Sequence, residues 1–228
     1  REEYPDRYIG QLSYFDYFAR PKKTALSPNI IAGPCMGLAT CDSLDPKFNH
    51  EMRMYNEWVE AKQHTGLILS MWIYQCFPNE TGGTRGFRNF PGFHAHKLET
   101  YMKMLARDRI DGVFLCGVSS HIDGYLTLKL MDDANLDIDK AMDEFFALYY
   151  GKAGVPLRKF YDTIEASFAE QGAGGTIQES YDRRGMKAIM KDCGQWMDEA
   201  VKLAATDEEK KRVELFKQGV WDHLQEGY

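Results

Sequence analysis

Hydrophobic positions in the first half of the chain follow two alternating patterns. Short apolar runs bounded by turn residues predict strands, and they occupy residues 8–17, 30–37, 67–74 and 113–118. Between the later runs, apolar residues recur at helical spacing, as Met52, Tyr55 and Val59 do. Strand and helix therefore alternate, which predicts an α/β fold with a parallel sheet.

Local signals indicate where these elements begin and end. Asp45 and Pro46 match an N-cap and a first helical position, where the missing N–H of proline costs nothing. Gly66 can end that helix. The run Leu67–Tyr74 is apolar almost without interruption, which is typical of a parallel strand covered on both faces.

Beyond Gly124 the pattern is helical throughout. Predicted helices cover residues 141–150, 156–169, 181–205 and 207–225. Thr206 and Glu209 have the spacing of a capping box at the start of the last helix, and Gly172–Gly175 is the best internal linker. We expect residues 1–151 to form a unit of alternating strands and helices that carries the site, and residues 152–228 to form a C-terminal helical region.

The segment Gly112–Gly124 is the most informative for function. A buried-looking strand opens there into a polar loop that contains Ser119, Ser120, His121 and Asp123. In parallel α/β architectures, ligand and catalytic groups lie on loops just past the carboxyl ends of strands. The sequence therefore predicts a site at this loop.

Three residues are the candidate catalytic groups: Asp16, His121 and Asp123. Asp16 lies near a strand end, where it either points into a cleft or makes a turn or salt bridge. His121 is either a neutral imidazole that contacts substrate and shuttles protons, or an exposed loop histidine. Asp123 either contacts substrate or caps the following helix.

Aromatic and basic residues near the same strand ends are the candidate substrate contacts. The set is Tyr14, Trp72, Tyr74, Arg85, Arg88 and Ser119. Trp72 and Tyr74 share one side of their strand by alternation. The two arginines lie in the long connection 75–92, where they either fork onto a uronate carboxylate or are solvated.

Two histidines raise the question of a metal. His94 and His96 have a spacing that suits two ligands on a strand but not on one face of a helix, and no acidic third ligand is close by. We therefore predict no metal and no cofactor.

Composition and charge exclude some classes of binding partner. The formal net charge of −6, without a basic cluster, argues against a nucleic-acid groove. No apolar run approaches the roughly 20 residues of a membrane span.

Five cysteines without CxxC spacing favour scattered thiols, although Cys35 and Cys41 could pair across a short loop. Aromatic residues make up 13% of the chain, and in clefts such side chains stack on sugar rings.

The chain also resembles a known family. The segments that carry the resemblance are 8–17, 28–34, 112–117, 136–151, 206–213 and 219–221. They look like the C-terminal half of DUF4838 proteins, which are similar to family 67 α-glucuronidases and related glycoside hydrolases. The resemblance implies the second half of a (β/α)8 barrel, with about four parallel strands, followed by helices. It also implies a first half of the barrel before residue 1, a carbohydrate substrate or ligand, and an extracytoplasmic (periplasmic or secreted) location.

Two classes of function follow from these patterns. Glycosidases need two carboxyl groups across the scissile bond. Similar proteins tend to carry glutamate in or after the strand 113–118, where this chain has Leu115, Cys116 and then Ser119. The first interpretation is a hydrolase of oligosaccharides, uronate-containing ones included, whose further carboxylate comes from the preceding half of the barrel. The second is a non-catalytic barrel that binds carbohydrate.

Overall fold

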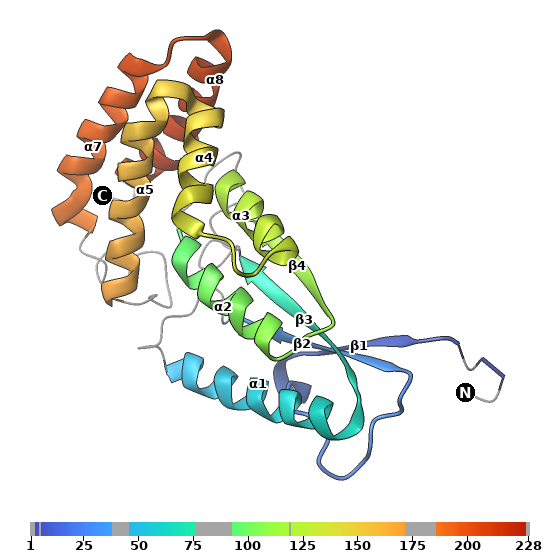
Figure 1. The fold of residues 1–228 in the computed structure, drawn as a ribbon. Helices are drawn as coiled ribbons and strands as arrows, with labels where there is room; N and C mark the ends of the chain where they lie inside the picture. Colours follow the sequence, from blue (N-terminus) through green and yellow to red (C-terminus); the bar gives the residue numbers. More distant parts are fainter. Residues whose placement is uncertain are drawn as a thin grey trace.

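The computed structural model describes residues 3–4, 6–37, 46–75, 93–118, 120–171 and 186–226. Four strands form one sheet in the order β1-β2-β3-β4, and each neighbouring pair is parallel (Figure 1). The strands are β1 (Ile9–Ser13), β2 (Ile30–Met36), β3 (Ile68–Gln75) and β4 (Gly112–Val118). The predicted α/β fold with four parallel strands is confirmed.

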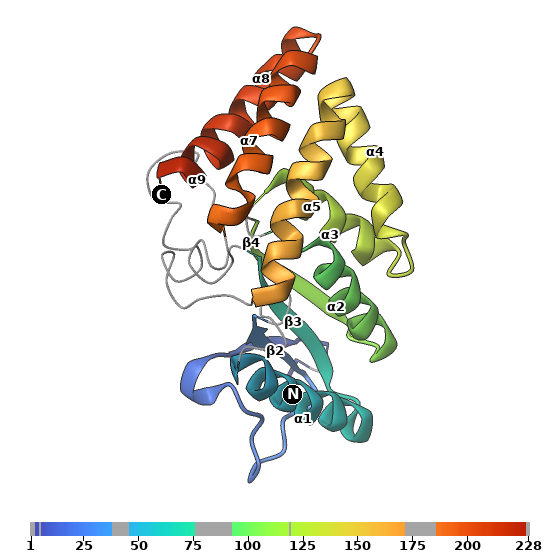
Figure 2. The same cartoon turned by 90° about the vertical axis from the view of Figure 1, so that its left-hand side faces the viewer.

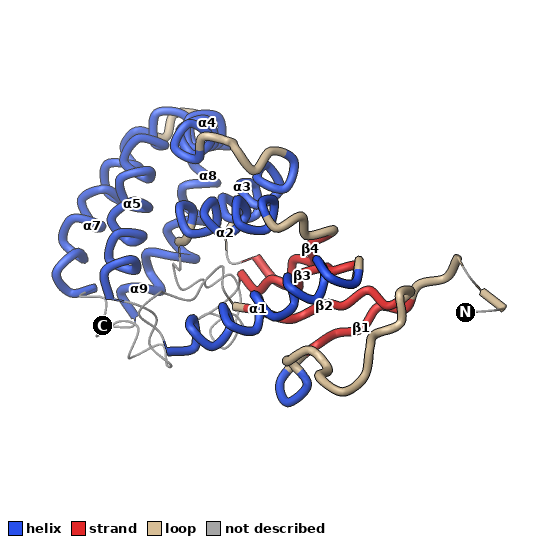
Figure 3. The backbone as a smooth tube through the Cα atoms, turned by 60° about the horizontal axis from the view of Figure 1, so that its bottom comes forward, coloured by secondary structure: helices blue, strands red, loops and turns tan. Residues whose placement is uncertain are grey.

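Helices cover one face of this sheet. The helices α1 (Pro46–Thr65) and α2 (Ala95–Arg107) lie on the same side of the strands (Figure 3). Burial along β3 has the same asymmetry, because Leu69, Met71 and Ile73 are 0% exposed while Trp72 and Tyr74 are only half-buried. The expectation that β3 is covered on both faces is therefore wrong within the described residues.

The end of α1 agrees with its sequence signal. Gly66 has φ of 69°, a left-handed conformation that favours glycine, and its N–H donates to the carbonyl oxygen of Lys62 at 2.9 Å. Asp45 lies outside the described residues, so its role as N-cap stays a prediction.

The second half of the chain is a helical region. Its elements are α3 (His121–Asp132), α4 (Ile138–Tyr150), the 3-10 turn Gly151–Ala153, α5 (Gly154–Gln171), α7 (Met186–Leu203), α8 (Asp207–Phe216), the π-helical η4 (Lys217–Trp221) and α9 (Asp222–Glu226). Figure 2 shows α4, α5, α7 and α8 gathered at the end of the molecule away from α1. Each of these helices contributes to the buried core, with Phe146, Phe160, Met197 and Val213.

The last predicted helix differs in detail from the structure. The segment 207–225 is not one regular α-helix, because π-helical turns at Lys217–Trp221 interrupt it. The capping box of Thr206 and Glu209 is confirmed at its start. Residues 172–185, which include the expected linker, lie outside the described ranges, and the boundary after residue 151 stays a prediction.

Two global expectations can be compared with the fold. None of the helices in the described ranges combines the length and the apolarity of a bilayer-crossing segment. Cys35 is a free thiol, so the possible pairing of Cys35 with Cys41 is not formed.

Candidate functional site

An aromatic band crosses the face of the sheet that the described helices leave uncovered, called the uncovered face below. It consists of Tyr14, Trp72, Tyr74 and Phe114. The rings of Trp72 and Phe114 stack, with centroids 3.9 Å apart and planes at 24°. The ring centroid of Tyr74 lies 6.4 Å from that of Trp72 and 6.4 Å from that of Tyr14. The band therefore connects β4 and β3 with the residue that follows β1.

Strand register explains how these rings meet. β3 and β4 pair so that Trp72 lies opposite Phe114 and Tyr74 opposite Cys116. Partners in register point to the same face of a sheet, and residues two apart share that face. The sequence placed Trp72 and Tyr74 on one side, but it missed Phe114, which is 51% exposed. Alternation along Gly112–Val118 could have suggested Phe114 as a residue of this face. Only the pairing of β3 with β4 shows that its ring contacts Trp72.

The Tyr74 phenol and the neighbouring Cys35 thiol are neutral at physiological pH. Burial raises the pKa of the Tyr74 phenol above its usual range, and its hydrogen bond with Tyr14 raises it further. Burial also raises the pKa of the adjacent Cys35 thiol to about 11. The band therefore offers ring faces and uncharged hydrogen-bonding groups, which suits a polyhydroxylated ligand better than an ion.

Asp16 lies close to this band in sequence. The strand expected over residues 8–17 ends at Ser13, and Asp16 belongs to a 3-10 turn, Phe15–Tyr17. Its carboxylate is exposed, two residues after Tyr14. Asp16 is thus a candidate acid that stays exposed in the structure.

Asp123 has a different environment from the expected polar loop. α3 already begins at His121, and the cap is Ser120, whose hydroxyl accepts from the Asp123 N–H at 3.2 Å. The Asp123 side chain is buried, at 4% exposure, and its Oδ1 accepts a hydrogen bond from the Tyr161 phenol at 2.9 Å. The expected loop is therefore a helix start, and this carboxylate faces α5.

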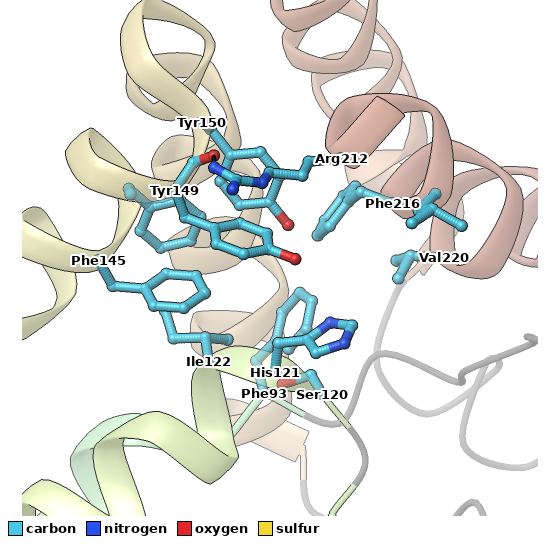
Figure 4. Close-up of a pocket in the computed structure, with 12 residues that line it drawn as sticks. Phe93, Ser120, His121, Ile122, Phe145, Tyr149, Tyr150, Arg212, Phe216 and Val220 are labelled. Carbon is cyan, nitrogen blue, oxygen red and sulfur yellow. Dashed lines mark hydrogen bonds between the residues drawn. The ribbon is translucent and has the colours of Figure 1, made fainter. Parts of the chain in front are cut away.

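His121 lines a small pocket on the helical side of the molecule. Its imidazole lies 6.1 Å from the ring of Tyr149, measured between centroids. The pocket also involves Tyr150, Arg212 and Phe216, from the end of α4 and from α8 (Figure 4). His121 and the aromatic band thus belong to different surroundings, and Arg212 was not predicted because it is 91 positions away in the chain from His121, with no local motif around it.

His96 makes ion pairs in the structure. Its Nδ1 lies 2.8 Å from Glu165 Oε2 and its Nε2 lies 3.4 Å from Asp139 Oδ1. The hydrogen bond to Glu165, opposed in part by burial, raises the pKa of His96 to about 9. His94 precedes α2 and is buried. Within the described ranges, no three His, Cys, Asp or Glu side chains gather as metal ligands.

Glu51 is a buried carboxylate that the sequence reading missed. It is 6% exposed, and its Oε2 accepts a hydrogen bond at 2.7 Å from the N–H of Gly37, directly after β2. Its position four residues before Tyr55 places it on the buried stripe of α1, and that spacing was the available signal. The bond ties α1 to the carboxyl end of β2.

Several candidates fall outside the described residues. These are Arg85, Arg88 and Ser119. Their proposed contacts stay predictions.

Comparison with known proteins identifies the family. No curated protein and no solved structure matches this chain. The family model described as a domain of unknown function, DUF4838, matches residues 1–162, which is more than half of the chain. The chain belongs to the DUF4838 family.

Proposed function

We propose that this chain binds carbohydrate through the aromatic band, as part of a glycoside-hydrolase-like (β/α) barrel. Four rings in mutual contact on an uncovered sheet face carry the proposal. Sugar rings present apolar C–H faces that stack on aromatic side chains, while their hydroxyls need neutral hydrogen-bonding partners. Tyr14 and Tyr74 supply both kinds of contact.

The band has two levels along the strands. Trp72 and Phe114 lie further from the carboxyl ends, at a level that is filled core in a closed barrel. Tyr74 lies next to the last residue of β3, and Tyr14 directly follows β1, so both are near the carboxyl edge of the sheet. Ligands of parallel α/β proteins bind at this edge. We therefore assign the sugar contact to Tyr14 and Tyr74, with Trp72 packed beneath them.

The proposed binding surface includes further strands. Within the described residues, β1 and β4 each lack a neighbour on one edge. Leu12 and Phe114 expose 47% and 51% of their surface on the uncovered side. Free parallel edges and bare apolar faces favour pairing with additional strands. We propose a preceding half-barrel of the same polypeptide as the partner that covers them.

Hydrolysis is the second candidate function, and the exposed carboxylate of Asp16, two residues after Tyr14 in the chain, favours it. A glycosidase needs two carboxyl groups about 5 to 9.5 Å apart across the scissile bond. Asp123 is bonded to Tyr161 on the helical side. In a catalytic version, Asp16 would act with a carboxylate from the preceding half-barrel, and Arg85 and Arg88 would hold a uronate group. Binding alone is the version with the greater support from the described residues.

Titration with oligosaccharides tests the binding proposal. Neutral and uronate-containing oligosaccharides are added to the chain while heat release and tryptophan fluorescence are recorded. Tyr14→Ala and Tyr74→Ala are each expected to weaken binding by about tenfold, the effect of losing one stacked ring. Tyr8→Ala is the control, because Tyr8 is 57% exposed and lies outside the band. Full affinity in both band variants would contradict the proposal.

A separate assay addresses catalysis. Aryl glycosides are incubated with the chain and with Asp16→Asn, which keeps the shape of the side chain and removes its acid function. Loss of turnover in the variant supports the hydrolase version. Equal turnover in both proteins removes Asp16 from the mechanism while leaving the binding proposal intact.

A further inference from the structure

We infer, on the basis of the proposed binding function, that Gly117 and Gln75 are positioning residues for the Tyr74 ring. They lie at the carboxyl ends of β4 and β3, the two strands that carry most of the aromatic band. Neither belongs to the band itself. Together they turn Tyr74 toward a ligand and keep the side chains of β4 away from the carboxyl-edge flank of its ring.

A bulge in β4 lies beside Tyr74. Tyr74 pairs with Cys116. The next residue of β3, Gln75, pairs with Val118, which leaves Gly117 as an extra residue in β4. Gly117 has φ of 71°, a left-handed conformation that is easy for glycine and strained for a residue with a side chain. Bulges bend a strand and change the direction of its side chains, and they are frequent beside functional sites.

The bulge moves Val118 from one face of the sheet to the other. In a regular strand, Val118 would follow Phe114 and Cys116 on the uncovered face, because residues two apart share a side. As the partner of Gln75, which is 4% exposed on the buried side of β3, Val118 lies on the face that the helices cover. Within its described residues, β4 therefore places no side chain beyond Cys116 on the uncovered face. A ligand can approach the Tyr74 ring from this direction without meeting Val118.

α3 provides the space for Val118 on the covered face. A Cβ built at Gly124, in the first turns of α3, would lie 3.0 Å from Val118 Cγ1, which is closer than such carbons normally approach. The Val118 side chain therefore occupies the place that a side chain at Gly124 would need. The absence of a side chain at Gly124 thus allows the direction that the bulge gives to Val118.

Gln75 ties the end of β3 to the same helix. Its Nε2 donates to the hydroxyl of Thr127, and this hydroxyl donates to the Asp123 carbonyl oxygen at 2.6 Å. Both side chains of the Gln75–Thr127 bond are buried. Neighbouring residues of a strand point to opposite faces, so a Gln75 side chain held on the covered face directs the Tyr74 ring to the uncovered one.

Gly117→Val tests the bulge without a ligand. A β-branched residue disfavours the left-handed conformation, so we expect a regular strand that brings Val118 onto the uncovered face. The ring resonances of Tyr74, assigned with Tyr74→Phe in the full chain carrying isotope-labelled tyrosine, should then shift. Gly66→Val is the matched control, because Gly66 has φ of 69° and precedes the amino end of β3. It should also lower the stability of the fold, but it should leave the Tyr74 resonances unchanged.

Oligosaccharide titration connects this positioning to binding. Cellohexaose and hexagalacturonate are added to each protein while heat release is recorded. Gly117→Val should weaken binding by about tenfold, the effect of losing one stacked ring, and Gly66→Val should leave the affinity unchanged. If neither sugar binds to the unsubstituted chain, the result counts against the proposed function, while the ring resonances still decide whether Gly117 positions Tyr74.

Substitutions of Thr127 test the second anchor. Thr127→Val keeps the shape of the side chain and removes the hydroxyl, so Gln75 loses its acceptor. The Tyr74 resonances should shift and the affinity should fall by about threefold. Thr127→Ser keeps the hydroxyl and should restore both. These two variants also decide the matter if Gly117→Val does not fold.

Three results would overturn the inference. The first is a set of Tyr74 resonances that stays unchanged in a folded Gly117→Val or Thr127→Val variant. The second is an equal shift of these resonances in Gly66→Val, because the change would then report only a less stable fold. The third is a Thr127→Ser variant that behaves like Thr127→Val, because the hydroxyl would then have no part in holding Gln75.

Discussion

Tyr161 on α5 donates its phenol hydrogen to Asp123 Oδ1 at 2.9 Å, and both side chains are buried. The same phenol oxygen accepts a hydrogen bond from the Ala95 N–H at 3.1 Å. One side chain of the helical region therefore holds the first turns of both α2 and α3. This contact also explains why Asp123 faces the helices rather than the uncovered sheet face.

Removing this phenol should destabilise the fold. Tyr161→Phe keeps the ring but removes two buried hydrogen bonds, the one to the Asp123 carboxylate and the one from the Ala95 N–H, which costs about 1 to 3 kcal/mol. Urea unfolding should show a lower midpoint with an unchanged slope. Tyr8→Phe, at an exposed position, is the control. Equal midpoints for the two variants would show that water replaces the lost bonds.

His96 makes stability depend on pH in the alkaline range. Its pKa in the folded chain is raised from 6.5 to about 9 by Glu165 and Asp139. The folded state therefore binds this proton more tightly than the unfolded state does. Protonated His96 stabilises the fold fully below pH 6.5, and this stabilisation is lost as pH rises through about 9. The imidazole is 47% exposed, so solvent screening reduces the effect to on the order of 1 kcal/mol.

The measurement is urea unfolding at several pH values between these limits. In His96→Gln, the free energy of unfolding should change less with pH over this range, because glutamine does not titrate. A profile of the same slope in the variant would assign the pH dependence to other groups.

Gly154 allows α4 and α5 to approach closely. A Cβ built at this position would lie 2.2 Å from the carbonyl oxygen of Phe146. Gly154→Ala should therefore force the two helices apart and cost about 1 to 3 kcal/mol, despite the better helix propensity of alanine. Gly10→Ala is the matched control, since a Cβ there meets nothing within 4 Å. Thermal unfolding of both variants compares them, and a Gly154→Ala protein as stable as the control would mean that the helices adjust freely.

The capping box of α8 gives a local prediction. The Thr206 hydroxyl accepts from the Glu209 N–H at 3.1 Å, and Glu209 Oε2 accepts from the Thr206 N–H at 3.3 Å. Thr206→Ala should cost about 1 kcal/mol. Thr163→Ala, inside α5, should be neutral or slightly stabilising, because alanine is the better helix former there. If circular dichroism during urea unfolding gives both variants the same stability, the cap contributes little to the whole fold.

The candidate site shows most clearly which features could be predicted from the sequence. Alternation along β3 was sufficient to place Trp72 and Tyr74 on one face, because residues two apart in a strand share a side. It could not identify Phe114 as the ring that Trp72 meets, because that depends on the register between β3 and β4. His121 was expected to share a pocket with Trp72, but its neighbours Tyr149 and Arg212 come from helices far along the chain.

The sequence by itself determined the order of strands and helices, the end of α1 at Gly66 and the cap of α8. These features depend on propensities and hydrogen bonds between residues a few positions apart. Tertiary structure decided that the described helices cover one face of the sheet, that Asp123 is bonded to a tyrosine 38 residues away, and that Arg212 lines the same pocket as His121. Such contacts depend on how whole elements pack, and packing energy is not encoded in any short segment of the chain.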